Sequence, residues 1–370
     1  MATELRVAIV SAYALSAFGG AQEQALAMSR ELTRRGHDVL VLAPDAHDHA
    51  NYDTPALVAR FGVVLKIPAN GSRAPLTLSP AASRDAARTV AHFRPDVVHF
   101  HEPFAPLIGW GALRAHRAPA LATFHRGGGG PALSLTKPLL RRLARHLDAS
   151  VAVSQSAAAT IHAACGIDPT VLFNGFEMER FVATPRERGD DTTLVVLGRL
   201  EERKGVAHAI NAVRAHNAKS DDPWRLVVLG DGPQRRALEA LAAGDLAIVF
   251  VGAPGDEEKR RWLRRANALI APSIGGESFG MILLEGMASE TSVVASDIDG
   301  YHEAAAGFAT LFTPGDDASL ESAIERALRD ETPASIARAK NHASEWSMAA
   351  LMDRYEELYA SARERFSATR

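Results

Sequence analysis

Two glutamates, Glu277 and Glu285, lie eight positions apart in the glycine-rich segment 275–285, which follows an apolar stretch ending at Ala271. A carboxylate can act as an acid, a base or a hydrogen-bond acceptor. Two carboxylates that share one reacting carbon, as in retaining glycosidases, must approach to about 5 Å. If the whole segment were helical, the rise per residue would separate this pair by about 12 Å along the axis. We therefore expect the two glutamates to have different roles.

The residues between the two glutamates predict a loop that runs into a helix. Glu277 is expected on the loop, where its carboxylate can accept hydrogen bonds from sugar hydroxyls. The free N–H groups of Ser278, Phe279 and Gly280 would present positive potential to an anion or a sugar oxygen. Glu285, two turns into the helix, can reach a ribose diol. The alternative is a glycine turn followed by a core helix with a solvated glutamate.

Two basic residues follow the predicted strand 194–197. Arg199 lies just beyond that strand, and Lys204 lies on the loop leading into the next predicted helix. Fixed cations at such a place can stabilise the negative charge that develops when a nucleoside diphosphate leaves. The same residues can belong to a solvated charge run, 201–204, and their spacing alone does not decide between the two interpretations.

Gly19 and Gly20 lie between the first predicted strand and the first predicted helix. A side chain at this place would block the close approach of the backbone to a ligand phosphate, although a tight turn would also explain the pair. The sequence contains neither the G-x-G-x-x-G nor the G-x-x-x-x-G-K-[ST] pattern, which argues against a dinucleotide-dependent dehydrogenase and a P-loop enzyme.

Three histidines lie at predicted strand ends. His125 follows the apolar strand 120–124 and is expected to point toward a ligand, with a helix-cap or turn histidine as the alternative. His99 and His101 are two positions apart and share one face of a strand, so a metal pair is conceivable. Because no third ligand follows at a recognisable spacing, we predict no metal site.

Short apolar stretches alternate with amphipathic ones in two series, which a polar, turn-rich segment, 184–193, separates. This alternation predicts parallel, doubly wound sheets and an α/β fold of two Rossmann-like domains facing each other across a cleft. Since ligands bind at the carboxyl ends of parallel strands, one cleft could hold two substrates. The predicted strands are 5–10, 39–42, 97–100, 120–124 and 151–153, then 194–197, 226–229, 248–251, 268–271 and 292–295.

The expected domains are residues 1–182 and residues 183–346, and the amphipathic helix 347–366 is expected to pack back on the first of them. A chain of 370 residues exceeds the usual size of one hydrophobic core. The first domain has a basic excess, with 18 Lys and Arg against 14 Asp and Glu, whereas residues 183–370 hold 23 against 30. The first domain is thus the better candidate for an anionic partner, but neither half has the charge or the motifs of a nucleic-acid binder.

Cys165 is the one cysteine, so the chain can form no internal disulfide and no thiolate metal cluster, which fits a cytoplasmic location. The N-terminus lacks a signal-peptide pattern, and no apolar run reaches the roughly 20 residues that span a bilayer. Any membrane contact is therefore expected to be peripheral.

The segment 275–285 resembles the E-x7-E signature of retaining GT-B glycosyltransferases, and the chain is most similar, within them, to the phosphatidyl-myo-inositol mannosyltransferases of actinobacteria. The signature together with the two cations is specific for the superfamily and much less specific for the substrate. Further similar stretches are Phe18–Gln22, His99–Pro103, Thr123–His125, Ala152–Ser154, Asn174–Gly175, Leu197–Arg199 and Arg203–Gly205.

The resemblance implies a hexosyltransferase that moves mannose from GDP-mannose, with retention of configuration, to a lipid-linked or polyol acceptor such as phosphatidylinositol. The resemblance implies that no cofactor is required, with Mg²⁺ as an optional ion that assists the diphosphate. The resemblance implies catalytic roles for His125, Glu277, Arg199 and Lys204; donor binding by Gly19, Gly20, Arg199, Lys204, Glu277, Ser278, Phe279, Gly280, Glu285, Asp256 and Lys259; and acceptor binding by Tyr13, Gln22, His125 and Arg126. An ordinary charged helix start would equally explain Asp256 and Lys259.

The sequence departs from this family after His125, where Arg126 and four glycines replace a hydroxyl-rich, lysine-containing stretch. Arg126 could replace the lost cation, and the glycines suggest a lid. Peripheral contact with an anionic membrane, at the inner face of the cell membrane, is one interpretation of a set of basic residues, and a solvated helix face is the other. The set is Arg84, Arg88, Lys137, Arg141, Arg142 and Arg145.

Three alternatives remain open at this point. A glycosyltransferase could use a UDP-sugar and a small soluble acceptor. A sugar-nucleotide epimerase of the same two-domain architecture would need acid and base groups around the sugar and no acceptor. A catalytically idle binder would hold the nucleotide sugar without hydrolysing or transferring it. Fold analogy alone cannot separate these functions.

Overall fold

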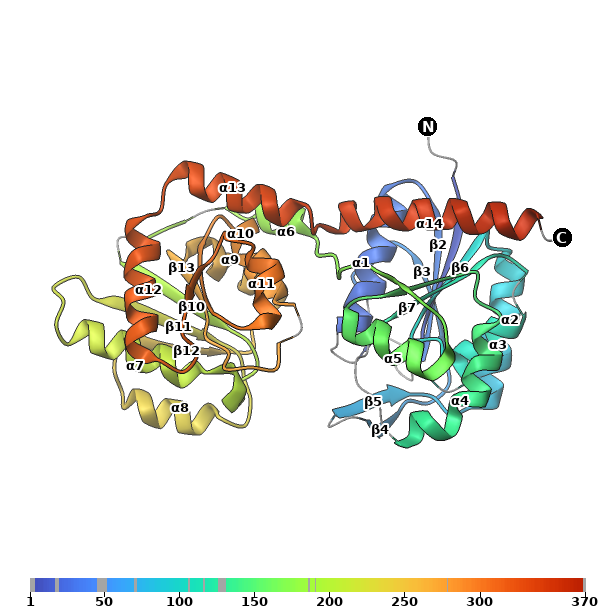
Figure 1. The fold of residues 1–370 in the computed structure, drawn as a ribbon, viewed down its shortest axis with the longest axis horizontal. Helices are drawn as coiled ribbons and strands as arrows, with labels where there is room; N and C mark the ends of the chain where they lie inside the picture. Colours follow the sequence, from blue (N-terminus) through green and yellow to red (C-terminus); the bar gives the residue numbers. More distant parts are fainter. Residues whose placement is uncertain are drawn as a thin grey trace. The chain divides into compact units, whose positions relative to one another are not determined.

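The chain divides into two compact units (Figure 1). Unit 1 comprises Met1–Gly175 and Met348–Arg370, and unit 2 comprises Phe176–Ser347. The computed structural model describes residues 4–16, 20–44, 52–69, 72–105, 107–115, 117–125, 131–185, 187–189, 191–277 and 279–368.

Unit 1 is built on a parallel sheet with the strand order β3-β2-β1-β6-β7-β8-β9. Its central strands are continuous runs of buried apolar residues, because helices cover both faces of the sheet. The strands are β1 Arg6–Ser11, β2 Asp38–Pro44, β3 Leu57–Phe61, β6 Val97–His101, β7 Ala120–Phe124, β8 Ala149–Ala152 and β9 Thr170–Val171, and an antiparallel hairpin joins β4 Leu65–Ala69 to β5 Ser72–Leu76. The helices are α1 Gly20–Arg34, α2 Pro80–Phe93, α3 Ile108–Ala115, α4 Pro131–Ala144 and α5 Gln155–Cys165.

Unit 2 repeats this design with a parallel sheet in the order β12-β11-β10-β13-β14-β15. Helices α7, α8 and α12 contribute to the core on one face, and α6, α9, α10, α11 and α13 pack around the other. The strands are β10 Thr192–Leu197, β11 Trp224–Leu229, β12 Ile248–Gly252, β13 Ala268–Ala271, β14 Ser292–Ser296 and β15 Thr310–Phe312. The helices are α6 Met178–Val182, η1 Glu202–Lys204, α7 Val206–Asn217, α8 Arg235–Ala242, α9 Asp256–Arg265, α10 Met281–Ala288, α11 Asp299–Ala305, α12 Asp317–Arg329 and α13 Pro333–Ser344.

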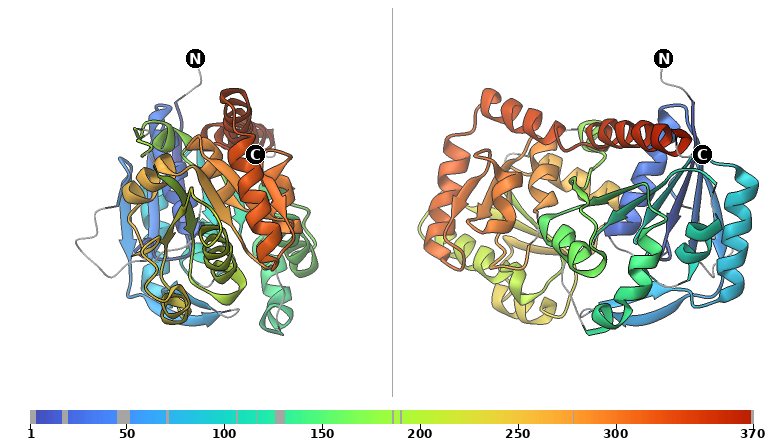
Figure 2. Two further views of the ribbon diagram at one scale, coloured as in Figure 1. Left: turned by 90° about the vertical axis from the view of Figure 1, so that its left-hand side faces the viewer. Right: turned by 45° about the vertical axis from the view of Figure 1, so that its right-hand side comes forward.

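The C-terminal helix α14, Met348–Ala368, belongs to unit 1, where it packs beside α1 (Figure 2). Tyr355 and Tyr359 are fully buried in the core that lies between this helix and the sheet. At the helix surface, Arg35 donates to the carbonyl of Ala349 at 2.7 Å and pairs with Asp353 at 2.7 Å. The last helix of the chain thus completes the first unit.

The boundary between the units lies after Gly175, seven residues before the boundary expected from the sequence. The polar segment 184–193 suggested a linker, but the chain has already entered unit 2 when it reaches this segment. Phe176 and Phe181 are buried in the core of unit 2, and their rings contact each other at 5.7 Å between centroids. The free energy gained by burying these apolar side chains sets the position of the boundary. The turn-rich composition of the segment that follows does not.

The expected α/β fold with two Rossmann-like, doubly wound domains is confirmed. Each sheet also contains short strands that the sequence did not predict, among them β3 and β15. No helix in the described part of the chain is both long enough and apolar enough to cross a bilayer.

Candidate functional site

Glu277 is the centre of a charged cluster in unit 2. Its Oε1 atom accepts hydrogen bonds from Lys204 Nζ at 2.6 Å, from Arg203 Nη1 at 3.1 Å and from Ser273 Oγ at 3.1 Å. The side chains of Glu277 and Lys204 are 14% and 22% exposed, so this ion pair is largely shielded from solvent. Hydrogen bonds with charged partners are stronger than neutral ones, and the carboxylate is therefore held in a fixed orientation.

The backbone around Glu277 needs glycine at several places. Gly276 and Gly280 have φ angles of 74° and 88°, in the left-handed region that residues with a Cβ atom rarely adopt. Gly300 passes so close to the loop that a Cβ atom there would lie 2.0 Å from the carbonyl oxygen of Glu277. The glycines of this segment therefore shape the loop that presents the carboxylate.

A buried tyrosine supports the same carboxylate from behind. Tyr301 donates through its hydroxyl to Ser273 Oγ at 2.9 Å, and Ser273 donates in turn to Glu277. Burial, with a smaller contribution from the negative charge of Glu277, raises the pKa of Tyr301 well above its usual value. The phenol stays protonated, so the chain of donors always points toward the carboxylate.

The loop after β10 brings the cations to this place. Gly205 lets that loop approach the segment after β13 closely, because a Cβ atom at Gly205 would lie 1.9 Å from the carbonyl oxygen of Pro272. Lys204 consequently reaches Glu277. Arg199 is 71% exposed and pairs with Glu201 at 3.0 Å, so the two predicted leaving-group cations lie on one loop but only Lys204 contacts the carboxylate.

Arg203 was not predicted as a site residue. Besides its bond to Glu277, its Nη1 donates to the carbonyl oxygen of Gly276 at 3.1 Å, and its Nε pairs with Glu201 at 3.0 Å. The sequence showed it as one member of a charge run, and its only signal was its place beside Lys204. Three cations, Arg199, Arg203 and Lys204, thus form ion pairs with two carboxylates, Glu201 and Glu277.

The second glutamate is paired with a different cation. Glu285 accepts from Lys259 Nζ at 3.0 Å, and the same ammonium lies 4.0 Å from Asp256 and 5.4 Å from the centre of the Phe181 ring. Glu285 and Lys259 are 17% and 21% exposed. The structure therefore brings three predicted donor-binding residues together and gives the two glutamates separate partners.

The other predicted donor residues near Glu277 differ in their surroundings. Phe279 packs its ring on Trp346 at 4.7 Å between centroids, and this partly buried side chain lies against the core of unit 2. Gly280 is the N-cap residue of α10, which begins at Met281. Ser278 lies outside the described residues, as do Gly19 and Arg126.

His125 lies in unit 1 immediately after β7. Its backbone N–H donates to Glu102 Oε1 at 2.6 Å, and its Nε2 lies 2.9 Å from His101 Nδ1. Burial lowers the pKa of His125 to about 4, against a smaller opposite effect of Asn174. The imidazole is therefore neutral at pH 7 and can exchange hydrogen bonds there without carrying a charge.

His125 is the last of three stacked histidines. The rings of His99 and His101 lie 4.9 Å apart, and those of His101 and His125 lie 5.2 Å apart. Burial lowers the pKa of His99 to about 3 and that of His101 well below its usual value. Among the described residues, the buried Nε2 of His101 has no hydrogen-bond partner.

A buried hydrogen-bond network joins this histidine row to the C-terminal helix. His99 Nδ1 lies 2.7 Å from the hydroxyl of Tyr359, and His99 Nε2 lies 2.7 Å from Thr123 Oγ1. The hydroxyl of Tyr355 lies 2.7 Å from the same Thr123 oxygen. The row is thus held by α14, which the sequence did not indicate.

Three further predicted residues of unit 1 lie near the start of α1. Tyr13 is buried, and its carbonyl accepts from Ser11 Oγ at 2.8 Å. Gln22 is buried, and its side-chain amide lies 3.5 Å from the carbonyl oxygen of Ala14. A Cβ atom on Gly20 would have no neighbour within 4 Å among the described atoms, so the packing of the protein does not itself require glycine here.

Models of two known families match the chain, one in each half. The model described as Glycosyltransferase Family 4 matches residues 18–180, and the model described as Glycosyl transferases group 1 matches residues 191–330. The first match ends five residues beyond the boundary between the units, and the second lies within unit 2.

Curated relatives match the chain almost from end to end. A phosphatidyl-myo-inositol mannosyltransferase of Mycolicibacterium smegmatis is 35% identical, over 95% of this chain and 94% of its own length. One of Propionibacterium freudenreichii is 30% identical, over 99% of this chain and 97% of its own.

Solved structures agree on the fold at lower identity. A glycosyltransferase from Rickettsia africae has a TM-score of 0.71 at 16% identity and covers 98% of this chain and 99% of its own. The Anabaena protein HepE in complex with UDP and glucose has a TM-score of 0.67 at 18% identity, over 97% of this chain and 100% of its own.

Proposed function

Because the chain belongs to the GT-B glycosyltransferase family that includes the phosphatidyl-myo-inositol mannosyltransferases, and is therefore a hexosyltransferase, we propose that it transfers mannose from GDP-mannose to a lipid-linked or polyol acceptor such as phosphatidylinositol. Identity of 30–35% along nearly the whole chain supports the choice of sugar and acceptor. The observation that carries the proposal is the carboxylate of Glu277 held among cations at the end of a parallel strand.

The geometry of Glu277 suggests which of its oxygens receives the sugar. The hydrogen bonds from Lys204, Arg203 and Ser273 all end on Oε1. None from the described part of the chain reaches Oε2, so this atom is the acceptor we assign to a sugar hydroxyl. In this assignment the cations fix one oxygen of the carboxylate and the substrate meets the other.

The cluster of cations beside Glu277 suits the leaving diphosphate. As the bond between the sugar and the diphosphate breaks, negative charge builds on the phosphate oxygens, and cations already in place stabilise it without reorganisation. We assign this role to Arg199, Lys204 and, in addition to the prediction, Arg203. Because these side chains supply the charge, we propose that no metal is required, with Mg²⁺ as an optional aid.

The pair of Glu285 and Lys259 is proposed to bind the nucleoside. Glu285 can accept from a ribose diol while Lys259, at 3.0 Å, holds the carboxylate in place. Lys259 and Asp256 at the start of α9 would then lie toward the base, as the family resemblance implies. Gly19, Gly20, Ser278, Phe279 and Gly280 complete the proposed donor contacts, Phe279 through its backbone.

Unit 1 is proposed to bind the acceptor through Tyr13, Gln22, His125 and Arg126. The low pKa of His125 leaves its imidazole neutral at pH 7. The ring can therefore orient a hydroxyl through a hydrogen bond, but it does not act as a general acid. Retention of configuration then places the proton of the acceptor on the departing phosphate oxygen, on the same face of the sugar. In this mechanism His125 is a positioning and binding residue.

Contact with an anionic lipid surface is proposed for basic residues of α2, of α4 and of the turn after α4. Arg84, Arg88, Arg141, Arg142 and Arg145 are exposed, and a lipid-linked acceptor would require the enzyme to reach a membrane. We therefore propose a cytoplasmic protein that meets the inner face of the cell membrane peripherally.

Calorimetric titration with nucleotides tests the donor assignment. GDP and GDP-mannose should bind with micromolar dissociation constants, whereas UDP and UDP-glucose should bind at least tenfold more weakly. Preference for UDP would overturn the mannosyl proposal while leaving a glycosyltransferase. Binding of GDP-mannose without hydrolysis or transfer would instead indicate an idle binder, and release of an epimerised nucleotide sugar an epimerase.

A further inference from the structure

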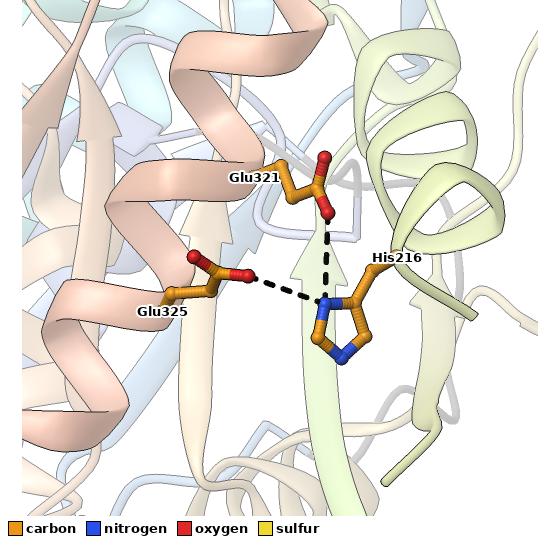
Figure 3. A group of neighbouring side chains, drawn as sticks. All are labelled: His216, Glu321 and Glu325. Atoms are coloured by element: carbon orange, nitrogen blue, oxygen red, sulfur yellow. Dashed lines mark ion pairs between the residues drawn. The ribbon is translucent and has the colours of Figure 1, made fainter. Parts of the chain in front are cut away.

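A second cluster of titratable side chains lies in unit 2 and serves no part of the proposed transfer. His216 is in the last turn of α7, and Glu321 and Glu325 lie four residues apart on α12, on the helix face that packs against α7. Figure 3 shows the Nδ1 atom of His216 directed toward both carboxylates. The three ligand atoms lie within 4.8 Å of one another.

The distances in this cluster are unusual for hydrogen bonds. His216 Nδ1 lies 3.6 Å from Glu321 Oε1 and 3.5 Å from Glu325 Oε1. A hydrogen bond would bring these atoms to about 2.7–3.2 Å. Two ligands bound at about 2.1 Å to a tetrahedral zinc ion lie about 3.4 Å apart, which agrees with both distances.

The other ring nitrogen of His216 already has a partner. Its Nε2 lies 3.2 Å from the carbonyl oxygen of Asp222, and because a carbonyl can only accept, Nε2 carries a hydrogen. Nδ1 is then the ring atom that faces the two carboxylates. A carbonyl on one ring nitrogen and a metal on the other is the usual outer-shell arrangement of a histidine ligand.

The ring is also held in place before any ligand arrives. It stacks on Trp224 with 3.6 Å between centroids and 5° between planes. The side chain of Asn217 binds both backbone groups of Trp224, at 2.8 and 2.9 Å, and so fixes the stacking partner. A rigid ligand loses little conformational freedom when it binds a metal.

The interior of the cluster is buried and incompletely satisfied. His216 is 8% exposed and Glu321 is 7% exposed, and Nδ1 of His216 has no hydrogen-bond partner among the described residues. The ammonium of Lys219 lies 2.8 Å from Glu321, but its side chain is 64% exposed and can turn away into solvent. Glu325, which is 48% exposed, gives an incoming ion access to the cluster.

We propose that His216, Glu321 and Glu325 bind a divalent transition-metal ion, for which zinc is the best match, and that this ion fastens α7 to α12. One imidazole nitrogen and two carboxylate oxygens form a ligand set that zinc accepts, with water in the fourth position. His216 lies ten residues along α7 from its first residue, Val206, an advance of about 15 Å. The ion is therefore remote from Lys204 and stabilises the fold of unit 2.

Zinc binding to the full-length protein without a metal-affinity tag tests this proposal. After treatment with a chelator and its removal, Zn²⁺ is titrated against the protein in competition with a chromophoric chelator. Wild type should bind one ion per chain and melt at a higher temperature in the presence of zinc. Glu325→Gln should weaken zinc binding tenfold or more while the metal-free variant melts as the metal-free wild type does.

Asp297→Asn is the matched control. Asp297 pairs with His302 at 2.7 Å, an ordinary hydrogen-bonded distance, on the surface of the same unit, and its loss should leave zinc binding unchanged. Equal zinc affinity of wild type and Glu325→Gln would overturn the proposal and indicate an ion pair with protonated His216. An equal loss in Asp297→Asn would do so as well, because it would mean that zinc binds the surface without a defined site.

Discussion

Replacing Glu277 by glutamine removes one negative charge from the proposed donor site and keeps the shape of the side chain. Oε1 of Glu277 accepts three hydrogen bonds, from Lys204, Arg203 and Ser273, and the amide oxygen of glutamine can take over this position. The amide NH₂ group then occupies the place of Oε2, where we assign the sugar hydroxyl. The substrate thus loses a charged hydrogen-bond acceptor, whereas Lys204, Arg203 and Ser273 keep an oxygen to which they can donate.

The expected loss follows from one hydrogen bond. A bond to a charged group contributes about 1.5–3 kcal/mol, which corresponds to a decrease in kcat/KM of roughly 10- to 150-fold. The nucleotide should respond in the opposite direction. Without the negative charge of the carboxylate, the positive charges of Lys204 and Arg203 attract the diphosphate more strongly, and we expect GDP to bind roughly two- to fivefold more tightly, the scale of a partly exposed ion pair.

The assay pairs initial rates of mannose transfer with calorimetric titration of GDP, on wild type, Glu277→Gln and Glu364→Gln. Glu364 is an exposed glutamate on α14, in the other unit, and its replacement should change neither quantity. A rate for Glu277→Gln within threefold of wild type would refute the sugar assignment. Parallel losses of rate and GDP affinity would refute the assignment of Lys204 and Arg203 to the diphosphate.

Three further predictions concern the supports of the site. Gly300→Ala places a Cβ atom 2.0 Å from the carbonyl oxygen of Glu277 and must displace that loop, so we expect a lower melting temperature and weaker GDP binding in calorimetry; wild-type values of both would contradict this. His125 has a pKa of about 4 in the folded protein and near 6.5 in the unfolded chain. Between these pH values the unfolded chain binds a proton that the folded protein does not bind. The free energy of unfolding therefore falls as the pH is lowered, by up to about 1.4 kcal/mol per pH unit. Urea unfolding at pH 7, 6 and 5 should show this slope reduced in His125→Gln, and an unchanged slope would count against the buried, neutral ring. Tyr359→Phe leaves His99 Nδ1 without its partner at 2.7 Å and should cost about 1–3 kcal/mol in urea unfolding at pH 7, whereas unchanged stability would show that the bond is unimportant.

Much of the fold can be predicted because its strands are continuous apolar runs. Residues 97–100 and 226–229, for example, lie in strands that helices bury on both faces, and such strands show no polar alternation. The unit boundary could not be predicted in the same way. It depends on whether Phe176 and Phe181 pack with one core or the other, and a polar segment nearby carries no information about that choice.

The proposed donor site can be predicted in part from the sequence because its residues carry local signals. Lys204 and Glu277 are 73 positions apart, but each follows a strand of the same sheet, and parallel strands bring their carboxyl ends together. Arg203 has no such signal beyond its neighbour. Arg203 reaches Glu277 because of the geometry of η1, and the pattern of apolar residues does not predict such a short turn.

The remaining clusters depend on packing between distant elements. His99 and Tyr359 are separated by 260 positions and meet only because α14 covers the sheet of unit 1. His216 and the pair Glu321 and Glu325 meet only because α7 and α12 lie side by side on the other sheet. In the sequence, two glutamates four positions apart are an ordinary helix surface, and the histidine that would distinguish them is about a hundred positions away.

The most direct test of the central proposal is a transfer reaction. Purified protein is incubated with GDP-[¹⁴C]mannose and vesicles containing phosphatidylinositol, and the lipids are extracted and separated. We predict a labelled, mannose-containing glycolipid that depends on phosphatidylinositol and is formed much more slowly by Glu277→Gln. Absence of labelled lipid with GDP-mannose, together with sugar transfer from a UDP-sugar under the same conditions, would contradict the proposed donor and acceptor.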